Sequence, residues 1–154
     1  MTEKNIHHQL TNKHTTTMKQ TYGNLRRTFM TELPAVYDRT TRMAYIDVQP
    51  DTQPAMHNGE GEDTEPVEGY SGFAVQTDGV IDYGHLKSLL IEAAYPQKDE
   101  HAIAINTLAA LLHKVEGKEL TEAEKADLDT FAQLEEYRTL CAGCARNVVN
   151  MFKV

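Results

Sequence analysis

The strongest constraint on the fold is an apolar row near the C-terminus of the chain. Thr121, followed three residues later by Glu124, has the form of a capping box, which opens a helix. Beyond it, apolar residues recur every three or four positions, as they do on one face of a helix. The sequence therefore predicts one long helix that runs unbroken to about Phe152. The members of the row are Leu128, Phe131, Leu134, Tyr137, Cys141, Cys144, Val148 and Met151.

From Leu134 onward the spacing of this row alternates between three and four residues, which is the heptad pattern of a packed helix seam. Such a seam is buried either against other helices of the same chain or against another chain, including a second copy. The sequence favours neither alternative. The candidate interaction residues on the seam are Leu134, Tyr137, Val148 and Met151.

Two shorter helices are predicted before the long one. Asp82 can cap a first helix whose apolar residues follow the helical rule, and Pro96 ends it. Asp99 can begin a second helix that stops at Gly117. The apolar residues are Leu86, Leu89, Leu90 and Ala93 in the first helix, and Ile103, Ile105, Leu108, Leu111 and Leu112 in the second.

Extended segments are predicted before the helices. Residues 35–37 and 43–48, on either side of a polar turn, are typical of a β-hairpin. Residues 49–70 are rich in proline and glycine and carry six acidic residues, which predicts a long loop. Residues 71–76 form a further predicted strand, and the Asp78-Gly79 turn leads into a last short extended run.

These elements predict an α+β fold within a chain of 154 residues, a length typical of one domain. We expect a flexible N-terminal arm over residues 1–27 and a small antiparallel β-region over residues 28–81, which contains the loop 49–70. A three-helix region over residues 82–154 completes the chain.

The charge is distributed unevenly along the chain. The formal net charge is −8, and residues 1–50 hold seven Lys and Arg against four Asp and Glu, whereas residues 51–154 hold eight against nineteen. The acidic balance argues against partners such as nucleic acids and anionic membranes, since both require a basic field. We expect a small basic cluster in the front half to pair with the acidic rear half. It consists of Arg26, Arg27, Arg39 and Arg42.

The motif Cys141-Ala142-Gly143-Cys144 is the sharpest chemical pattern in the chain. Reactive cysteines usually lie at the start of a helix, where the helix dipole lowers the pKa of the thiol. Cys141 and Cys144 instead fall well inside the long predicted helix, on its apolar row. Core packing is therefore the favoured interpretation, and a metal or redox site on these two cysteines is the alternative.

No catalytic motif stands out in the sequence. Neither Ser71 nor Ser88 lies in a GxSxG nucleophile elbow, and no Walker A or GxGxxG run is present. We therefore expect a protein that is not an enzyme and has no cofactor. The histidines at positions 7, 8 and 14 and the acidic loop are expected to be solvated, because neither has the spacing or scaffold of a metal site.

One stretch of sequence resembles a known group of proteins. Residues 82–100 read DYGHLKSLLIEAAYPQKDE, and residues 136–141 read EYRTLC. This half of the chain resembles small uncharacterised proteins encoded among the phage and prophage structural genes of gut bacteria. The resemblance implies a role in a virion or its tail, after synthesis in the bacterial host cytoplasm, and supplies no catalytic residue. The same segment also has the local sequence signals of a helical hairpin, which would be information about fold rather than function.

The expected function is that of a non-enzymatic structural or interaction protein of a phage-like particle, with protein partners and with a homo-oligomer as one arrangement. Two alternatives stay open. One is an assembly chaperone that never enters the particle. The other is a small metal or redox module that uses Cys141 and Cys144.

Overall fold

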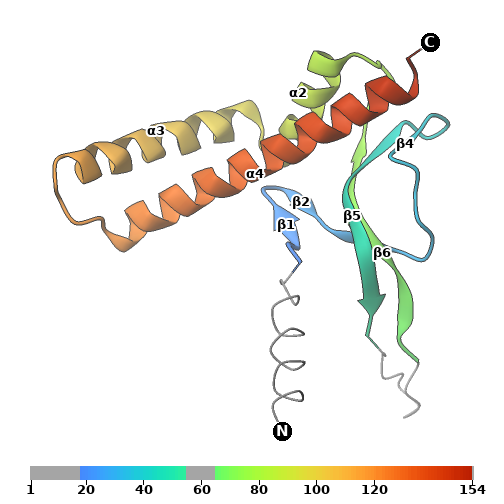
Figure 1. Cartoon of the computed structure of the whole chain (residues 1–154). Helices are drawn as coiled ribbons and strands as arrows, with labels where there is room; N and C mark the ends of the chain where they lie inside the picture. The colour runs from blue at the N-terminus through green and yellow to red at the C-terminus, as the bar shows by residue number, and fades with distance from the viewer. Residues whose placement is uncertain (1–17, 55–64, 154) are drawn as a thin grey trace, which may run out of the picture.

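The computed structural model describes residues 18–54 and 65–153, and it has the predicted α+β fold (Figure 1). The strands are β1 (Thr21–Tyr22), β2 (Leu25–Arg26), β3 (Thr28–Met30), β4 (Tyr37–Asp38), β5 (Met43–Gln53) and β6 (Val67–Gln76), and the helices are α2 (Tyr83–Ala94), α3 (Gln97–Val115) and α4 (Glu122–Met151). One antiparallel sheet has the order β3-β6-β5-β4, and β1 pairs with β2 in a separate hairpin.

The predicted hairpin around residues 38–41 is confirmed, with Tyr37 of β4 opposite Ala44 of β5. The next prediction, a loop over residues 49–70, is corrected at both ends, because β5 continues to Gln53 and β6 begins at Val67. Between these strands the connection is shorter than expected, and residues 55–64 lie outside the described part of the chain.

Pro50 lies inside β5, opposite Tyr70 of β6. Because β4 pairs only with the first two residues of β5, no described strand pairs with this edge of β5 at Pro50. Proline is tolerated on such an edge, since its missing N–H removes no hydrogen bond from a neighbouring strand. The proline that favoured a loop in the sequence is therefore compatible with a strand.

A β-bulge interrupts the pairing of β5 with β6. Asp47 and Val48 stand opposite Gly72 alone, and Asp47 has a φ of +53°, a left-handed conformation that Asp adopts more readily than most residues. A Cβ atom at position 72 would lie only 2.9 Å from Cγ2 of Val48. Glycine is therefore required at this position, and the bulge places Asp47 where it meets the N-terminal segment.

The predicted arm over residues 1–27 is corrected for its last part, while residues 1–17 lie outside the described residues. Tyr22 is buried, with its ring 5.2 Å from that of Phe73 and 5.3 Å from that of Tyr137. The backbone N–H of Asn24 donates to the carbonyl of Ala94 at the end of α2. Residues 18–27 are thus packed between the sheet and the helices.

The three helices begin and end close to their predicted positions. Asp82 caps α2 by accepting a hydrogen bond from the N–H of His85, and the helix ends before Pro96. A complete capping box between Thr121 and Glu124 opens α4. These helix boundaries confirm the local signals in the sequence.

Helix α4 belongs to two parts of the molecule (Figure 1). Its second half packs against α2 and β5, whereas its first half packs against α3 and extends away from the sheet. We call α3 and the first half of α4, residues 97–133, the helical arm. In the described part of the chain, no helix has the length and the hydropathy that a membrane span requires.

Candidate interaction surface

The seam predicted on α4 lies inside the chain. Leu134, Tyr137 and Val148 are buried in the core between the helices and the sheet, and the Tyr137 hydroxyl donates a 2.5 Å hydrogen bond to the carbonyl oxygen of Leu90. These three candidate interaction residues therefore offer no surface to another chain. Met151, the fourth, is 51% exposed at the end of the helix.

The two cysteines belong to the same core. Cys141 and Cys144 are buried and free, and burial raises the pKa of the Cys141 thiol to about 12 and that of Cys144 to about 11. The Cys144 thiol lies 3.7 Å from the carbonyl oxygen of Tyr45. A protonated, buried thiol is a poor nucleophile and metal ligand, which favours the core-packing interpretation.

His85 and His113 are each paired with a separate carboxylate and do not lie at one site. Nε2 of His85 lies 2.5 Å from Oδ2 of Asp78, and Nδ1 of His113 lies 2.6 Å from Oε2 of Glu124. Within residues 18–54 and 65–153, no group of three or more His, Cys, Asp or Glu side chains is placed to hold a metal ion. The histidines at positions 7, 8 and 14 and residues 55–64 of the acidic loop lie outside those ranges.

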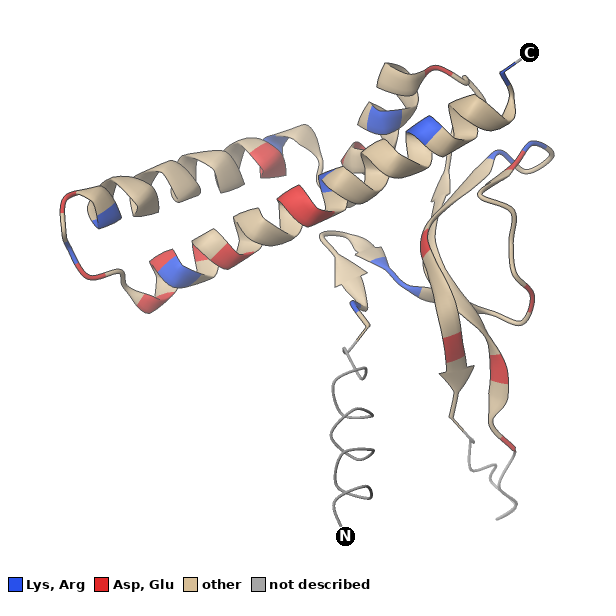
Figure 2. Cartoon of the chain, viewed as in Figure 1, with Lys and Arg blue, Asp and Glu red and all other residues tan. Residues whose placement is uncertain are grey.

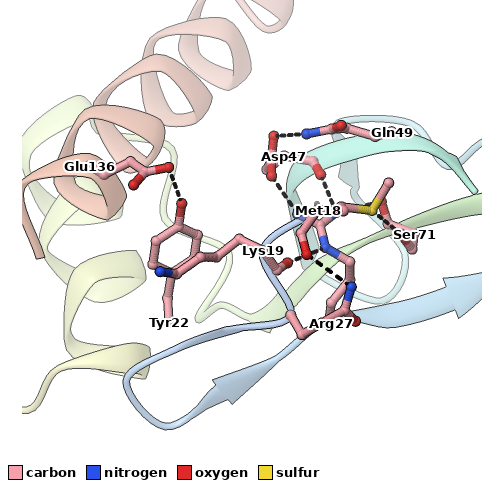
Figure 3. A network of polar contacts seen from close by, with 9 residues as sticks. Met18, Lys19, Tyr22, Arg27, Asp47, Gln49, Ser71 and Glu136 are labelled. Atoms are coloured by element: carbon pink, nitrogen blue, oxygen red, sulfur yellow. Dashed lines mark hydrogen bonds and ion pairs between the residues drawn. The ribbon is translucent and has the colours of Figure 1, made fainter. Parts of the chain in front are cut away.

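A buried arginine fastens the N-terminal segment to the sheet (Figure 3). The guanidinium of Arg27 donates to the carbonyl oxygens of Lys19, Asp47 and Ser71 and forms an ion pair with the Asp47 carboxylate. It also lies 4.7 Å from the centre of the Phe73 ring. These contacts occupy the guanidinium of Arg27, so the role of this side chain is structural.

Within residues 18–54 and 65–153, the basic cluster forms no ion pair with a carboxylate of the rear half, contrary to the expectation from the sequence. The carboxylate partner of Arg27 is Asp47, which belongs to the front half, because the bulge in β5 directs Asp47 toward it. The Arg39 guanidinium lies over the ring of Phe152, and Arg42 donates to the carbonyl oxygen of Asp78.

A cleft of about 570 Å³ lies between α2 and the base of the helical arm. Lys87, Glu92, Glu100 and Arg138 contribute charged groups to it, but Nη1 of Arg138 lies 2.8 Å from Oε1 of Glu100. The mixed and partly paired charges give the cleft no preference for an anion or a cation.

On the outer side of α3, large apolar side chains that were expected to be buried are exposed. Ile105, Leu108, Leu112 and Val115 are 54%, 69%, 57% and 84% exposed, respectively. The side of α3 that packs against α4 instead buries the small residues Thr107 and Ala110. Single exposed apolar residues are common on protein surfaces, but a contiguous group of them marks an interaction site.

Charge is absent from the middle of this helix, as Figure 2 shows. Residues 102–112 contain no Asp, Glu, Lys or Arg, whereas residues 122–136 of α4 contain six acidic residues and one lysine. The helical arm therefore has a neutral, apolar side on α3 and an acidic side on α4. The arrangement suits apolar contact with a protein partner through α3.

Sequence periodicity did not reveal this surface, because apolar residues occur on both sides of α3. The missed signal was the uncharged run of residues 102–112, which is longer than one buried helix face requires.

Comparison of the chain with known protein families, curated proteins and solved structures finds no match.

Proposed function

We propose that the chain is a non-enzymatic structural or interaction protein of a phage-like particle that docks on a protein partner through the outer side of α3. The observation that carries the proposal is the group of exposed apolar side chains on that helix, Ile105, Leu108, Leu112 and Val115. Water excluded from such a group on docking provides a favourable free energy in proportion to the apolar area buried.

The geometry of the helical arm supports docking at this place. A hairpin of two helices covers only one side of each helix, and most of the stability of a helix in a protein comes from packing of its apolar side. In the described residues the arm extends beyond the sheet and α2, so no other element covers α3 (Figure 1). A partner laid along α3 would supply the missing packing.

The particle is proposed on the resemblance of residues 82–100 and 136–141 to proteins encoded among phage structural genes. In the fold these residues form α2, the start of α3 and the middle of α4. The alternative of a metal or redox module receives no support from the thiols, because Cys141 and Cys144 are buried and their pKa values are raised.

The test is the protein content of purified particles, measured by quantitative mass spectrometry for three versions of the chain. We expect the wild-type chain to be a stoichiometric component and Ile105→Glu to be depleted at least tenfold. Asn106→Glu adds the same charge at a neighbouring exposed position of α3 and should be retained.

Two outcomes would contradict the proposal. Absence of the wild-type chain from particles that require it for assembly would identify an assembly chaperone. Equal retention of Ile105→Glu and Asn106→Glu would show that the outer side of α3 is not the docking surface.

A further inference from the structure

A heptad row runs along the exposed side of α3. Its members are separated by four, three, four, three and four residues, and all six are exposed. Positions with this alternation lie along one line on a helix and can form the seam of a helix pair. The row, which we call the α3 outer row, consists of Lys98, Ala102, Ile105, Ala109 and Leu112 of α3, and of Glu116 at the C-cap of the helix.

The α3 outer row is complementary to itself when two copies run antiparallel. In the register that places Ile105 of one copy opposite Ala109 of the other, Leu112 lies opposite Ala102. Each large side chain then faces a small one, which is how packed layers interdigitate. The alanines also allow the two helix axes to approach toward the short end of the usual range, about 8 Å.

The charges at the ends of the row fit the same register. Position 98 then lies opposite position 116, so that Lys98 of one copy meets Glu116 of the other at both ends of the pair. A parallel arrangement would instead place Lys98 beside Lys98 and Glu116 beside Glu116. Within the chain, Glu116 lies 3.0 Å from Lys118 across an exposed pair, which is weak in water and easily exchanged.

The exposed apolar strip runs along α3 from Ala102 to Val115. A helix of 19 residues is about 28 Å long, and Leu108 and Val115 widen the apolar strip on one side of the row. Ordinary stable interfaces bury about 800 Å² per partner around an apolar centre with a polar rim. The strip supplies the centre, and the polar residues of the helix ends supply the rim.

A second copy also avoids the acidic side of the helical arm. When two α3 helices pair, the two α4 helices lie on the outside, and the six acidic residues between positions 122 and 136 of each copy remain in solvent. The product is a four-helix arrangement with twofold symmetry, the commonest symmetry of homodimers.

We infer that the partner that covers α3 is a second copy of this chain, paired antiparallel through the α3 outer row. The inference rests on the proposed function, because it names the occupant of the proposed docking surface. The two sheets would then lie at opposite ends of the dimer, each free to contact other components of an assembly.

The first test is the mass of the full chain by size-exclusion chromatography with light scattering, over a concentration series. We expect twice the 17.3 kDa of one chain. Ile105→Glu should raise the dissociation constant at least about 30-fold, as loss of a central anchor does, and Asn106→Glu should leave it unchanged. A wild-type monomer at all concentrations, with a native circular dichroism spectrum, would overturn the inference.

The second test is the direction of pairing. Lys98→Glu and Glu116→Lys should each weaken the dimer about 3- to 10-fold at low salt, and the double variant should recover wild-type affinity. A double variant no tighter than the single variants would overturn the antiparallel register.

The proposed particle role and the proposed pairing with a second copy can be refuted independently of each other. A monomeric chain whose entry into particles is lost in Ile105→Glu would refute the second copy and leave docking through α3 intact. A dimer that is never found in particles would refute the particle role and leave the pairing intact.

Discussion

The hydroxyl of Tyr22 donates a 2.6 Å hydrogen bond to Oε1 of Glu136 (Figure 3). This contact joins the first described strand to α4 near the point where the helix leaves the core for the helical arm. Burial is the largest cause that raises the pKa of Tyr22, followed by the hydrogen bond to Glu136. The Tyr22 hydroxyl therefore remains protonated and donates.

We predict that Tyr22→Phe lowers the free energy of unfolding by about 1 kcal/mol, the usual contribution of one hydrogen bond. Tyr22→Ala should cost about 3 to 5 kcal/mol, because it also removes a ring packed against Phe73 and Tyr137. Urea denaturation measures both values. Equal losses in the two variants would show that the ring contributes little.

The bulge in β5 provides a second stability test. Asp47→Asn keeps the shape of the side chain and tolerates a positive φ, but it removes the charge that faces buried Arg27. We expect a loss of about 2 kcal/mol for Asp47→Asn and a larger loss for Asp47→Ala, which also leaves the guanidinium without a side-chain partner.

Asp51→Asn is the matched control for that pair, because Asp51 lies on the same strand and, among the described residues, accepts a hydrogen bond from the N–H of Thr52 next to it. It should change the free energy of unfolding by less than about 0.5 kcal/mol. If the two asparagine variants lose similar free energies of unfolding, the ion pair with Arg27 is not the cause of the loss in Asp47→Asn.

The buried thiols predict a loss of stability at alkaline pH. Burial raises the pKa of Cys141 to about 12 and of Cys144 to about 11, from an ordinary value of 9.0. Above pH 9 the unfolded chain releases these protons while the folded chain keeps them, so the unfolded state is favoured as pH rises. Each thiol contributes a slope of up to about 1.4 kcal/mol per pH unit between its two pKa values.

The measurement is the unfolding free energy of the wild type and of the Cys141→Ala, Cys144→Ala double variant at pH 8 and pH 10. The double variant is expected to start less stable and to lose less on going to pH 10. In the wild type at pH 8, both thiols should react with a disulfide reagent only after unfolding in urea. Rapid labelling of the folded chain would contradict their burial.

The capping box controls the far end of the helical arm. Thr121→Ala removes the acceptor for the N–H of Glu124 and should cost about 1 kcal/mol. Because the arm extends beyond the sheet, we expect the effect as faster amide hydrogen exchange at the start of α4, with unchanged exchange in β5 and β6. Thr130→Ala, within the same helix, is the control; uniform acceleration through the chain would contradict a local effect.

Much of the fold was predictable from the sequence because its signals are local. Asp82, Pro96 and the Thr121–Glu124 pair define helix ends through contacts within a few residues. The strand character of residues 49–53 was missed because Pro50 favours a loop unless the strand has a free edge, and that depends on where β4 ends. The bulge at Asp47 was missed for a similar reason, because it depends on the pairing of β5 with β6.

The packing of residues 18–27 and the exposed side of α3 were not predictable for a different reason. Tyr22 and Arg27 have partners far along the chain, in β6 and α4, which no periodicity encodes. In α3 both sides are apolar, and only the tertiary structure shows that Thr107 and Ala110, rather than Ile105 and Leu112, face α4.

Cysteine cross-linking tests the antiparallel contact between two α3 helices. Chains with Ile105→Cys and chains with Ala109→Cys are mixed and oxidised, with the native thiols protected by burial. We expect the heterodimer joined between positions 105 and 109 to form fastest, because these positions face each other within the reach of a disulfide. Cross-linking no faster than that of an Asn106→Cys chain would contradict it.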